Sequence, residues 1–320
     1  MSSYVATSPK SISIKKAAAT AAAGKKKKVN VKPYLFLAPA MLALIWWVYK
    51  PLFGTLRYSF YDWGMVPGTQ AVFNGLDNFK KLLRNKDFWP AVKNTFVYIL
   101  GMLPFSIILP LFMASATQGL KERSKKIYRA FFFLPMIMAP VAVSTIFQWL
   151  FHPSNGLVNH VLKSLGVIEN NISYFTTQGL SMLVIILISG WKMIGFATLM
   201  YSSALSGIDK RYYEAASLDG AGVFASFFHV TLPLLSPTVM MMIMMSVLFS
   251  GQWSFAYIDV LTQGGPFGTS TNIYYLMYKF AFGDMNVGVC AAAAGMFMII
   301  FGGMALVLQM LSRRMAFYDN

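Results

Sequence analysis

Charged residues are scarce in this chain, and acidic ones are the scarcest. Only 12% of its 320 residues are charged and only 11 are Asp or Glu, whereas 57% are hydrophobic. An ordinary soluble domain has about 25% charged residues. Water is therefore not the main solvent of this chain, and we expect a membrane protein.

Cysteine, histidine and the common catalytic motifs are also missing or rare. The single Cys290 excludes an intramolecular disulfide framework. The three histidines lie in different segments without metal-ligand spacing, so we predict no metal site. The phosphate-loop pattern G-x-x-x-x-G-K-[ST], the zinc motif H-E-x-x-H and the elbow G-x-S-x-G are absent. We therefore predict no catalytic residue and no cofactor bound by this chain.

The positions of the carboxylates bear on how the chain works. All eleven fall between apolar runs or at their ends. A proton relay or cation site usually needs a carboxylate at mid-membrane, and the potassium-filter sequence TVGYG is absent. Ion coupling is thus disfavoured. If the chain supports uphill transport, another polypeptide must supply the energy.

Six long apolar runs are what the sequence does contain. A helix needs about 20 apolar residues to cross a membrane, and runs of this kind cover residues 33–53, 95–117, 128–151, 180–205, 230–251 and 287–311. We predict an all-α polytopic integral membrane protein with six transmembrane helices over residues 32–320. The low-complexity residues 1–31 are predicted to form a basic, disordered tail.

The basic residues predict the orientation of these helices. Most of the 27 lie before the first run, between the second and third, between the fourth and fifth, or after the sixth. Lys and Arg near helix ends favour the cytoplasmic side, so we expect both termini to be cytoplasmic. The lysine run at 25–28 then serves as a topology anchor at the lipid surface. Without aromatic or motif context it does not indicate nucleic-acid binding.

The most polar passage between two apolar runs is "EAASLDGAGVFASFFHVTLPLLSP" at 214–237. Asp209 is placed to cap a helix start, and Gly220 follows the end of that helix, where a positive φ costs nothing. A second short helix is expected over 223–230, with Pro233 and Pro237 restricting entry to the fifth span. Two interpretations remain open: a helical hairpin on the bilayer surface, and a docking element for a partner.

This passage resembles the EAA loop of the membrane subunits of ABC importers. The loop reads E-A-A, two residues, D-G-A, an aromatic-rich helix and L-P-x-x-x-P. The matching positions are Glu214, Ala215, Ala216, Asp219, Gly220, Ala221, Phe227, Leu232, Pro233 and Pro237. The segments at 32–40, 75–83, 131–143 and 261–282 are similar to carbohydrate-type permeases of the maltose and glycerol-phosphate importers. Departures are the methionine-rich fifth run and the lack of the extra amino-terminal helices of the enteric maltose subunit.

The resemblance implies a type I ABC importer permease fold with a cytoplasmic EAA coupling loop at about 206–232. Its implied partners are a second homologous permease in a heterodimer, two ABC ATPase subunits that use ATP and Mg, and an extracytoplasmic solute-binding protein. The implied location is a bacterial or archaeal cytoplasmic (inner) membrane. ATPase docking would rest on Glu214, paired with a basic residue of the ATPase, and on Ala215, Ala216, Asp219, Gly220 and Ala221.

Two polar and aromatic stripes are candidates for a substrate pathway. Sugars offer hydroxyl edges and C–H faces, so a pathway needs hydrogen-bonding groups beside aromatic ones. The first stripe is Ser189, Lys192, Met193 and Phe196, which share one helical face. The second is Phe249, Gln252 and Trp253, and the family analogy adds Met138 and Ala142. Lys192 snorkelling to an interface and Trp253 in an interfacial belt are the alternatives.

The sequence therefore predicts a permease subunit, not an enzyme, that forms half of a pathway for a sugar or oligosaccharide. One alternative is the same machine importing a glycerol phosphate or another non-sugar polar solute, since Lys192 suits an anion. A second is a stand-alone channel or facilitator. The segment "TQGGPFGTST" at 262–271 is predicted to be a turn-rich connector, with contact to a binding protein as the other interpretation.

Overall fold

The computed structural model describes residues 32–66 and 68–315, so the tail predicted for residues 1–31 lies outside the described residues. The chain divides into two compact units, residues 1–53 and residues 54–320. The described part of the first is helical, with α2 (Lys32–Leu44), the π-helical turn η1 (Ile45–Tyr49) and the start of α3 (Lys50–Tyr58). The segment Tyr34–Tyr58 is long and apolar enough to span a membrane.

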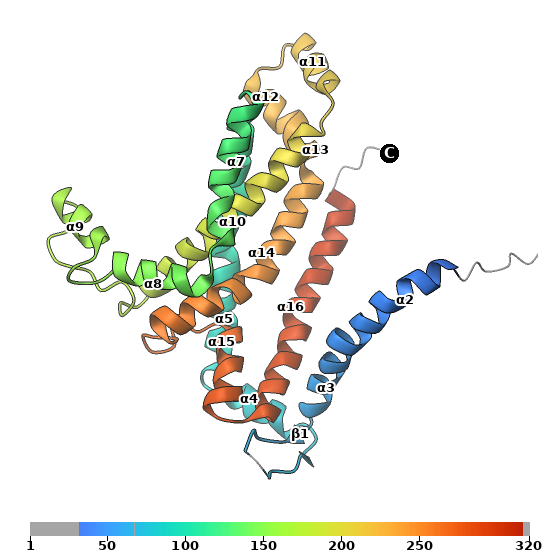
Figure 1. The fold of residues 1–320 in the computed structure, drawn as a ribbon, viewed down its shortest axis with the longest axis vertical. Coiled ribbons are helices and arrows are strands. Elements are labelled where there is room, and N and C mark those ends of the chain that lie inside the picture. The colour runs from blue at the N-terminus through green and yellow to red at the C-terminus, as the bar shows by residue number, and fades with distance from the viewer. Residues whose placement is uncertain (1–31, 67, 316–320) are drawn as a thin grey trace, which may run out of the picture. The chain divides into compact units, whose positions relative to one another are not determined.

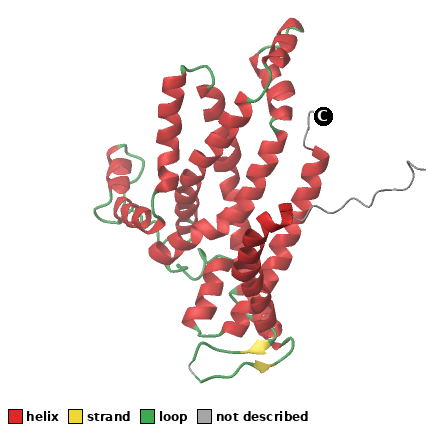
Figure 2. Ribbon diagram, turned by 45° about the vertical axis from the view of Figure 1, so that its right-hand side comes forward, coloured by secondary structure: helices red, strands yellow, loops and turns green. Residues whose placement is uncertain are grey.

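The second unit is built almost entirely of helices (Figures 1 and 2). They are, in chain order, α4 (Asp77–Arg84), α5 (Phe88–Leu103), η2 (Pro104–Ile108), α6 (Leu109–Thr117), α7 (Glu122–Ile137), α8 (Pro140–Leu150), α9 (Leu157–Ser164), α10 (Leu180–Ser206), α11 (Lys210–Leu218), α12 (Val223–Ser226), η3 (Phe227–Thr231), α13 (Leu232–Leu234), α14 (Ser236–Tyr257), η4 (Ile258–Thr262), α15 (Ile273–Tyr278), η5 (Lys279–Gly283) and α16 (Val287–Met315). The strands β1 (Tyr61–Asp62) and β2 (Val72–Phe73) pair antiparallel.

The predicted spans agree with these helices in number but not in every detail. The described residues hold 5 single helices that could cross a membrane, and 6 if the bent pair Arg123–Ile137 and Pro140–Leu150 is counted as one span. The prediction of one continuous third span over 128–151 is wrong, because α7 and α8 meet at an angle of 93°. Met138 and Ala139 are extended there and Pro140 opens α8, since a residue before proline avoids the helical region.

The fifth span also begins later than its apolar run. We predicted 230–251, whereas the helix capable of spanning covers Ser236–Thr262. Residues 227–234, which comprise η3 and α13, continue the shorter apolar helix Val223–Leu234. Leu235 leaves the helical path with ψ of −4°, and Pro237 then stands in the first turn of α14, where its missing N–H costs nothing.

Helix α10 lies at the centre of the second unit. It packs against α6, α7 and α14, and α14 packs in turn against α5 and α16. The backbones of α10 and α7 lie close together at Gly195, where an added Cβ would overlap the carbonyl oxygen of Phe132 in α7. Small residues let membrane helices approach to backbone contact, so this glycine determines how α7 lies on α10.

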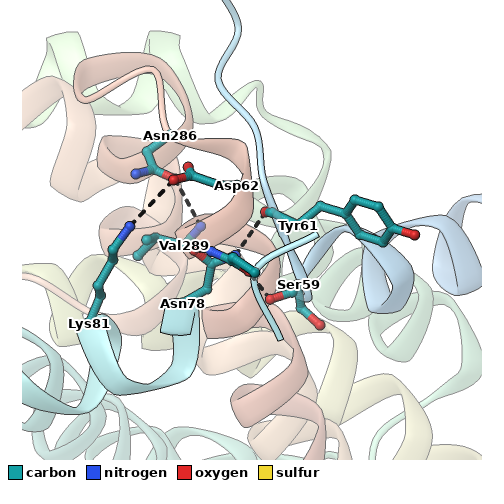
Figure 3. A network of polar contacts seen from close by, with 8 residues as sticks. Ser59, Tyr61, Asp62, Asn78, Lys81, Asn286 and Val289 are labelled. Carbon is teal, nitrogen blue, oxygen red and sulfur yellow. Dashed lines mark hydrogen bonds and ion pairs between the residues drawn. The ribbon is translucent and has the colours of Figure 1, made fainter. Parts of the chain in front are cut away.

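One end of the second unit is held together by a polar network around Asn78 of α4 (Figure 3). Asn78 is fully buried, and its Nδ2 donates to the carbonyl oxygens of Ser59 at 3.0 Å and Tyr61 at 2.8 Å. Asn286 caps α16 by accepting from the N–H of Val289 at 3.0 Å. The network therefore holds the end of α3, strand β1 and α4 together, and β1 also contacts α16.

Candidate functional site

The EAA segment, residues 206–232, occupies the end of the second unit opposite to β1 and α4 (Figure 1). It folds as α11, a turn, α12 and η3. Helix α11 and η3 are joined by a hydrogen bond between Tyr213 and Thr231, whose hydroxyl oxygens lie 3.0 Å apart. The predicted second helix over 223–230 is confirmed and is longer than expected, because α12, η3 and α13 follow one another without a break as one apolar helix, Val223–Leu234. The predicted sequence of helix, turn and helix is confirmed.

Asp209 caps α11 as its position in the sequence predicts. One carboxylate oxygen accepts from the backbone N–H of Arg211 at 2.9 Å and the other from Nε of Arg211 at 2.8 Å. These hydrogen bonds lower the pKa of the Asp209 carboxyl from its usual 3.8. A lowered carboxyl pKa means that the cap stabilises the helix above pH 3.8 and is lost as the pH falls through the lower folded-state value.

Gly220 ends α11 in a Schellman motif. Its φ is +78°, its N–H donates to the carbonyl of Ser217 at 3.1 Å, and the N–H of Ala221 donates to the carbonyl of Ala216 at 2.9 Å. This pair of bonds defines the motif. The predicted positive φ at Gly220 is confirmed, and the turn reverses the chain between α11 and α12.

Substituting Gly220 with alanine is expected to loosen this turn by about 1 to 2 kcal/mol, because a left-handed residue with a Cβ is strained. No atom lies within 4 Å of the new Cβ, so the strain is confined to the backbone. Hydrogen exchange of the Ala221 amide should become about tenfold faster. Gly222 is the matched control: its φ is −70° and a Cβ there also meets nothing within 4 Å. Equal exchange in the Gly220→Ala and Gly222→Ala variants would contradict the motif.

The tip of the EAA segment combines charge with exposed apolar side chains. Glu214 and Asp219 are exposed, and Leu218, Val223 and Phe224 are each more than 80% exposed. Contiguous exposed apolar side chains on a folded protein mark an interaction site or a membrane contact. The tip therefore has the properties expected of a surface that a partner covers.

The structure brings four of the nine predicted pathway residues together between α10 and α14. Met193, Phe196, Phe249 and Trp253 belong to one apolar cluster. Phe249 and Trp253 stack with ring centroids 4.7 Å apart and an interplanar angle of 11°. Gln252 is exposed on the next turn. Two stripes from different helices thus meet, although their spacing in the sequence did not require it.

Lys192 lies at the bend between α7 and α8. Its side chain is 7% exposed, and Nζ donates to the carbonyl oxygen of Met138 at 3.0 Å. This carbonyl follows the last residue of α7, where a cation is favourable. Ser189, one turn earlier, is 1% exposed, and Ala142 is exposed on α8. The Lys192 side chain therefore reaches the bend rather than the surface of the unit.

Sequence reasoning missed the role of the 263–272 connection. Asn272 is fully buried, and its Nδ2 donates to the carbonyl of Gly251 at 2.9 Å and to Oγ of Ser254 at 2.8 Å. Its Oδ1 accepts from the N–H of Tyr275 at 2.8 Å and so caps α15. The connection thus clamps the turn of α14 that carries Gln252 and Trp253. An Asn before an apolar helix was a signal for the cap, but nothing local indicated the bond to α14.

The family model of the "Binding-protein-dependent transport system inner membrane component" matches residues 95–317, which include α7, α10, the EAA segment and α14. The chain belongs to this family. A probable ABC transporter permease of Pyrococcus horikoshii is 31% identical over 86% of the chain and 93% of its own length. The sn-glycerol-3-phosphate transport permease of Pectobacterium atrosepticum is 27% identical over 86% and 92%. A probable ABC transporter permease of Bacillus subtilis is 28% identical over 87% and 94%.

The fold agrees with a solved structure as well. The crystal structure of a bacterial ABC transporter that imports the acidic polysaccharide alginate contains a chain with a TM-score of 0.77. The two are 24% identical, and the match covers 90% of this permease and 98% of that chain. The prediction of a type I permease fold is therefore confirmed, as is that of a membrane transport component and not an enzyme.

Proposed function

We propose that this permease is the membrane-spanning subunit of an ATP-driven, binding-protein-dependent importer and forms half of the path for a sugar or oligosaccharide. The observation that carries the proposal is the EAA segment: a capped helix, a Schellman turn and an exposed tip of Glu214, Leu218 and Phe224. Such a tip suits insertion into a cleft of a second protein. The same assembly importing a glycerol phosphate is the alternative, supported by the relatives that transport sn-glycerol 3-phosphate.

The proposed setting is a bacterial or archaeal cytoplasmic membrane, with both termini and the EAA segment in the cytoplasm. Lys121, Arg123 and Lys210 flank the helix ends beside the segment, which supports this orientation. The proposed partners are a second homologous permease, two ABC ATPases and an extracytoplasmic solute-binding protein. ATP and Mg would be used by the ATPases, and this chain would bind neither.

Coupling would act through the tip of the EAA segment. Glu214 would pair with a basic residue of the ATPase, while Ala215, Ala216 and Ala221 keep the backbone close to it. Asp219 and Gly220 form the turn that presents these residues. Helices α11 and η3 are joined by the hydrogen bond between Tyr213 and Thr231. A displacement of the tip by the ATPase would therefore be transmitted to α13 and α14.

The proposed pathway runs where α10, α14 and the bend between α7 and α8 meet. The stacked pair Phe249 and Trp253 would offer an aromatic face to the C–H face of a sugar, and Gln252 would offer hydrogen bonds. Met138, Ala142, Ser189, Lys192, Met193 and Phe196 complete the proposed lining. Ser189, Lys192 and Met193 are buried in this conformation, so they would reach the substrate only after α7 and α8 move away from α10.

Charge reversal at the tip tests the proposal. Glu214→Lys should weaken association with the ATPase subunits at least about 30-fold, because leaving an interfacial charge unpaired costs about 2 kcal/mol or more. Association is measured by titrating the ATPase onto the permease pair in lipid nanodiscs. Glu169→Lys is the control, since Glu169 is exposed outside the EAA segment and should bind as the wild type. Wild-type affinity in the Glu214→Lys protein would refute the docking role.

A further inference from the structure

A second site lies where the EAA segment meets the ends of α6, α7 and α10. An open cavity of about 780 Å³ is lined by the ends of α6, α7 and α10 and by α11, α12 and η3. Its volume falls within the range of about 300–1,000 Å³ found for small-ligand sites. All of its lining residues belong to the second unit.

One wall of the cavity is cationic and rich in hydrogen-bond donors. It presents Lys125 of α7 and Lys210 of α11, with Ser115, Gln118 and Ser206. The hydroxyl of Ser115 is buried and has no hydrogen-bond partner within the described residues. Buried polar atoms are almost always paired, so this hydroxyl is available to donate a hydrogen bond to a ligand in the cavity. The described residues that line the cavity include no carboxylate.

A further positive charge lies one helical turn from Lys125 on the same helix. Arg129 donates from Nε at 3.1 Å and from Nη2 at 2.7 Å to Oγ of Ser202. A hydroxyl orients the guanidinium without neutralising it. Ser202 is in turn one helical turn before Ser206, which lines the cavity. Arg129 therefore adds to the positive potential at the cationic wall.

The remaining wall is apolar, and the cavity lies where three helices end. Leu205, Ile208, Val223 and Phe227 form this wall. Gln118 follows the end of α6, Lys125 is in the first turn of α7, and Ser206 ends α10. The ends of membrane-spanning helices lie at the level of the lipid headgroups. A cationic wall facing an apolar wall at this depth suits a molecule with an anionic head and an apolar tail.

We propose that this cavity binds the phosphate headgroup of an anionic phospholipid. Basic pockets between transmembrane helices bind such headgroups, and the apolar wall would take the glycerol and the first carbons of the acyl chains. The bound lipid joins Lys125 in the bundle to Lys210 in the EAA segment. Its presence therefore stiffens the link between the EAA segment and α7 and α10. The site adjoins the tip proposed to bind the ATPase, because Ala221 and Val223 belong to both, whereas Lys125 and Lys210 lie outside the tip.

Native mass spectrometry of the delipidated full chain tests the proposal. The chain is titrated with phosphatidylglycerol, with phosphatidylcholine and with inorganic phosphate alone. We expect one phosphatidylglycerol to bind tightly, phosphatidylcholine to bind at least about tenfold more weakly, and inorganic phosphate not to saturate. Saturable binding of phosphate without phosphatidylglycerol would overturn the lipid assignment.

A pair of matched double variants identifies the site. Lys125→Gln with Lys210→Gln should weaken phosphatidylglycerol binding at least about tenfold. Lys126→Gln with Lys163→Gln removes the same charge from two exposed positions outside the cavity and should leave binding unchanged. Equal losses in both proteins would show only a general charge effect and would overturn the site. Because no ATPase is present, failure here leaves the docking role of Glu214 untouched, and failure of docking leaves the lipid site untouched.

Discussion

The Gly195→Ala protein is expected to unfold at a temperature about 6 to 12 °C lower than the wild type. The added Cβ overlaps the carbonyl oxygen of Phe132 and comes within 2.9 Å of Cα of Phe133. Both are backbone atoms of α7, so no side-chain rotation relieves the contact. Overpacking of this kind costs about 3 kcal/mol, and each kcal/mol lowers the midpoint by about 2 to 4 °C in a chain of this size. Thermal unfolding of the detergent-purified chain measures the effect.

Gly303→Ala is the control for this substitution. Gly303 lies in α16, and a Cβ there has no atom within 4 Å. The variant should be as stable as the wild type, or more stable by up to about 1 kcal/mol from helix propensity. A Gly195→Ala protein with a wild-type midpoint would show that α7 and α10 do not approach at these residues.

Asn272→Ala is the second substitution with a large expected effect. The Asn272 side chain makes three hydrogen bonds, to the carbonyl of Gly251, the hydroxyl of Ser254 and the N–H of Tyr275. Its loss leaves the N–H of Tyr275 unpaired in a buried place, at about 1 to 3 kcal/mol, and removes two further buried hydrogen bonds at about 0.5 to 1.5 kcal/mol each. We expect the free energy of unfolding to fall by about 3 kcal/mol. Amide exchange over residues 249–257 should increase, because this connection holds that part of α14.

Two companion variants separate the contributions. Asn272→Asp keeps the acceptor for Tyr275 and loses the donor to α14, so it should preserve the start of α15 yet still speed exchange over 249–257. Asn170→Ala makes the same truncation at an exposed position and should change neither quantity. If Asn272→Ala exchanged at the wild-type rate over 249–257, the clamp on α14 would be refuted.

Features that depend on a few neighbouring residues could be predicted from the sequence. The cap at Asp209 and the left-handed Gly220 were predicted because each needs only its own helix end. The break in the third span was missed because apolar residues continue on both sides of it. Pro135 and Pro140 in "FLPMIMAPV" were the available signal, since a proline at the start of a helix and another inside one favour a bend.

Contacts between distant segments could not be predicted in the same way. The bond from Lys192 to Met138 joins residues 54 positions apart, and Asn272 meets Gly251 across 21 positions. The cavity where the EAA segment meets the ends of α6, α7 and α10 draws Ser115, Lys125 and Lys210 from three separate helices. Taken alone, each of these side chains is compatible with several roles. The residues that surround it in the folded protein decide which role it has.

From the sequence alone it was possible to predict that the chain lies in a membrane, how many spans it has, the turn at Gly220 and the family of this permease. The length of apolar runs, local capping chemistry and motif spacing are properties of short stretches of sequence. They do not depend on how the helices pack against one another. The tertiary structure alone decided the 93° bend between α7 and α8, the place of Lys192, the clamp at Asn272 and the basic cavity. These depend on which helices lie side by side, and that is determined by backbone contacts such as Gly195 on Phe132.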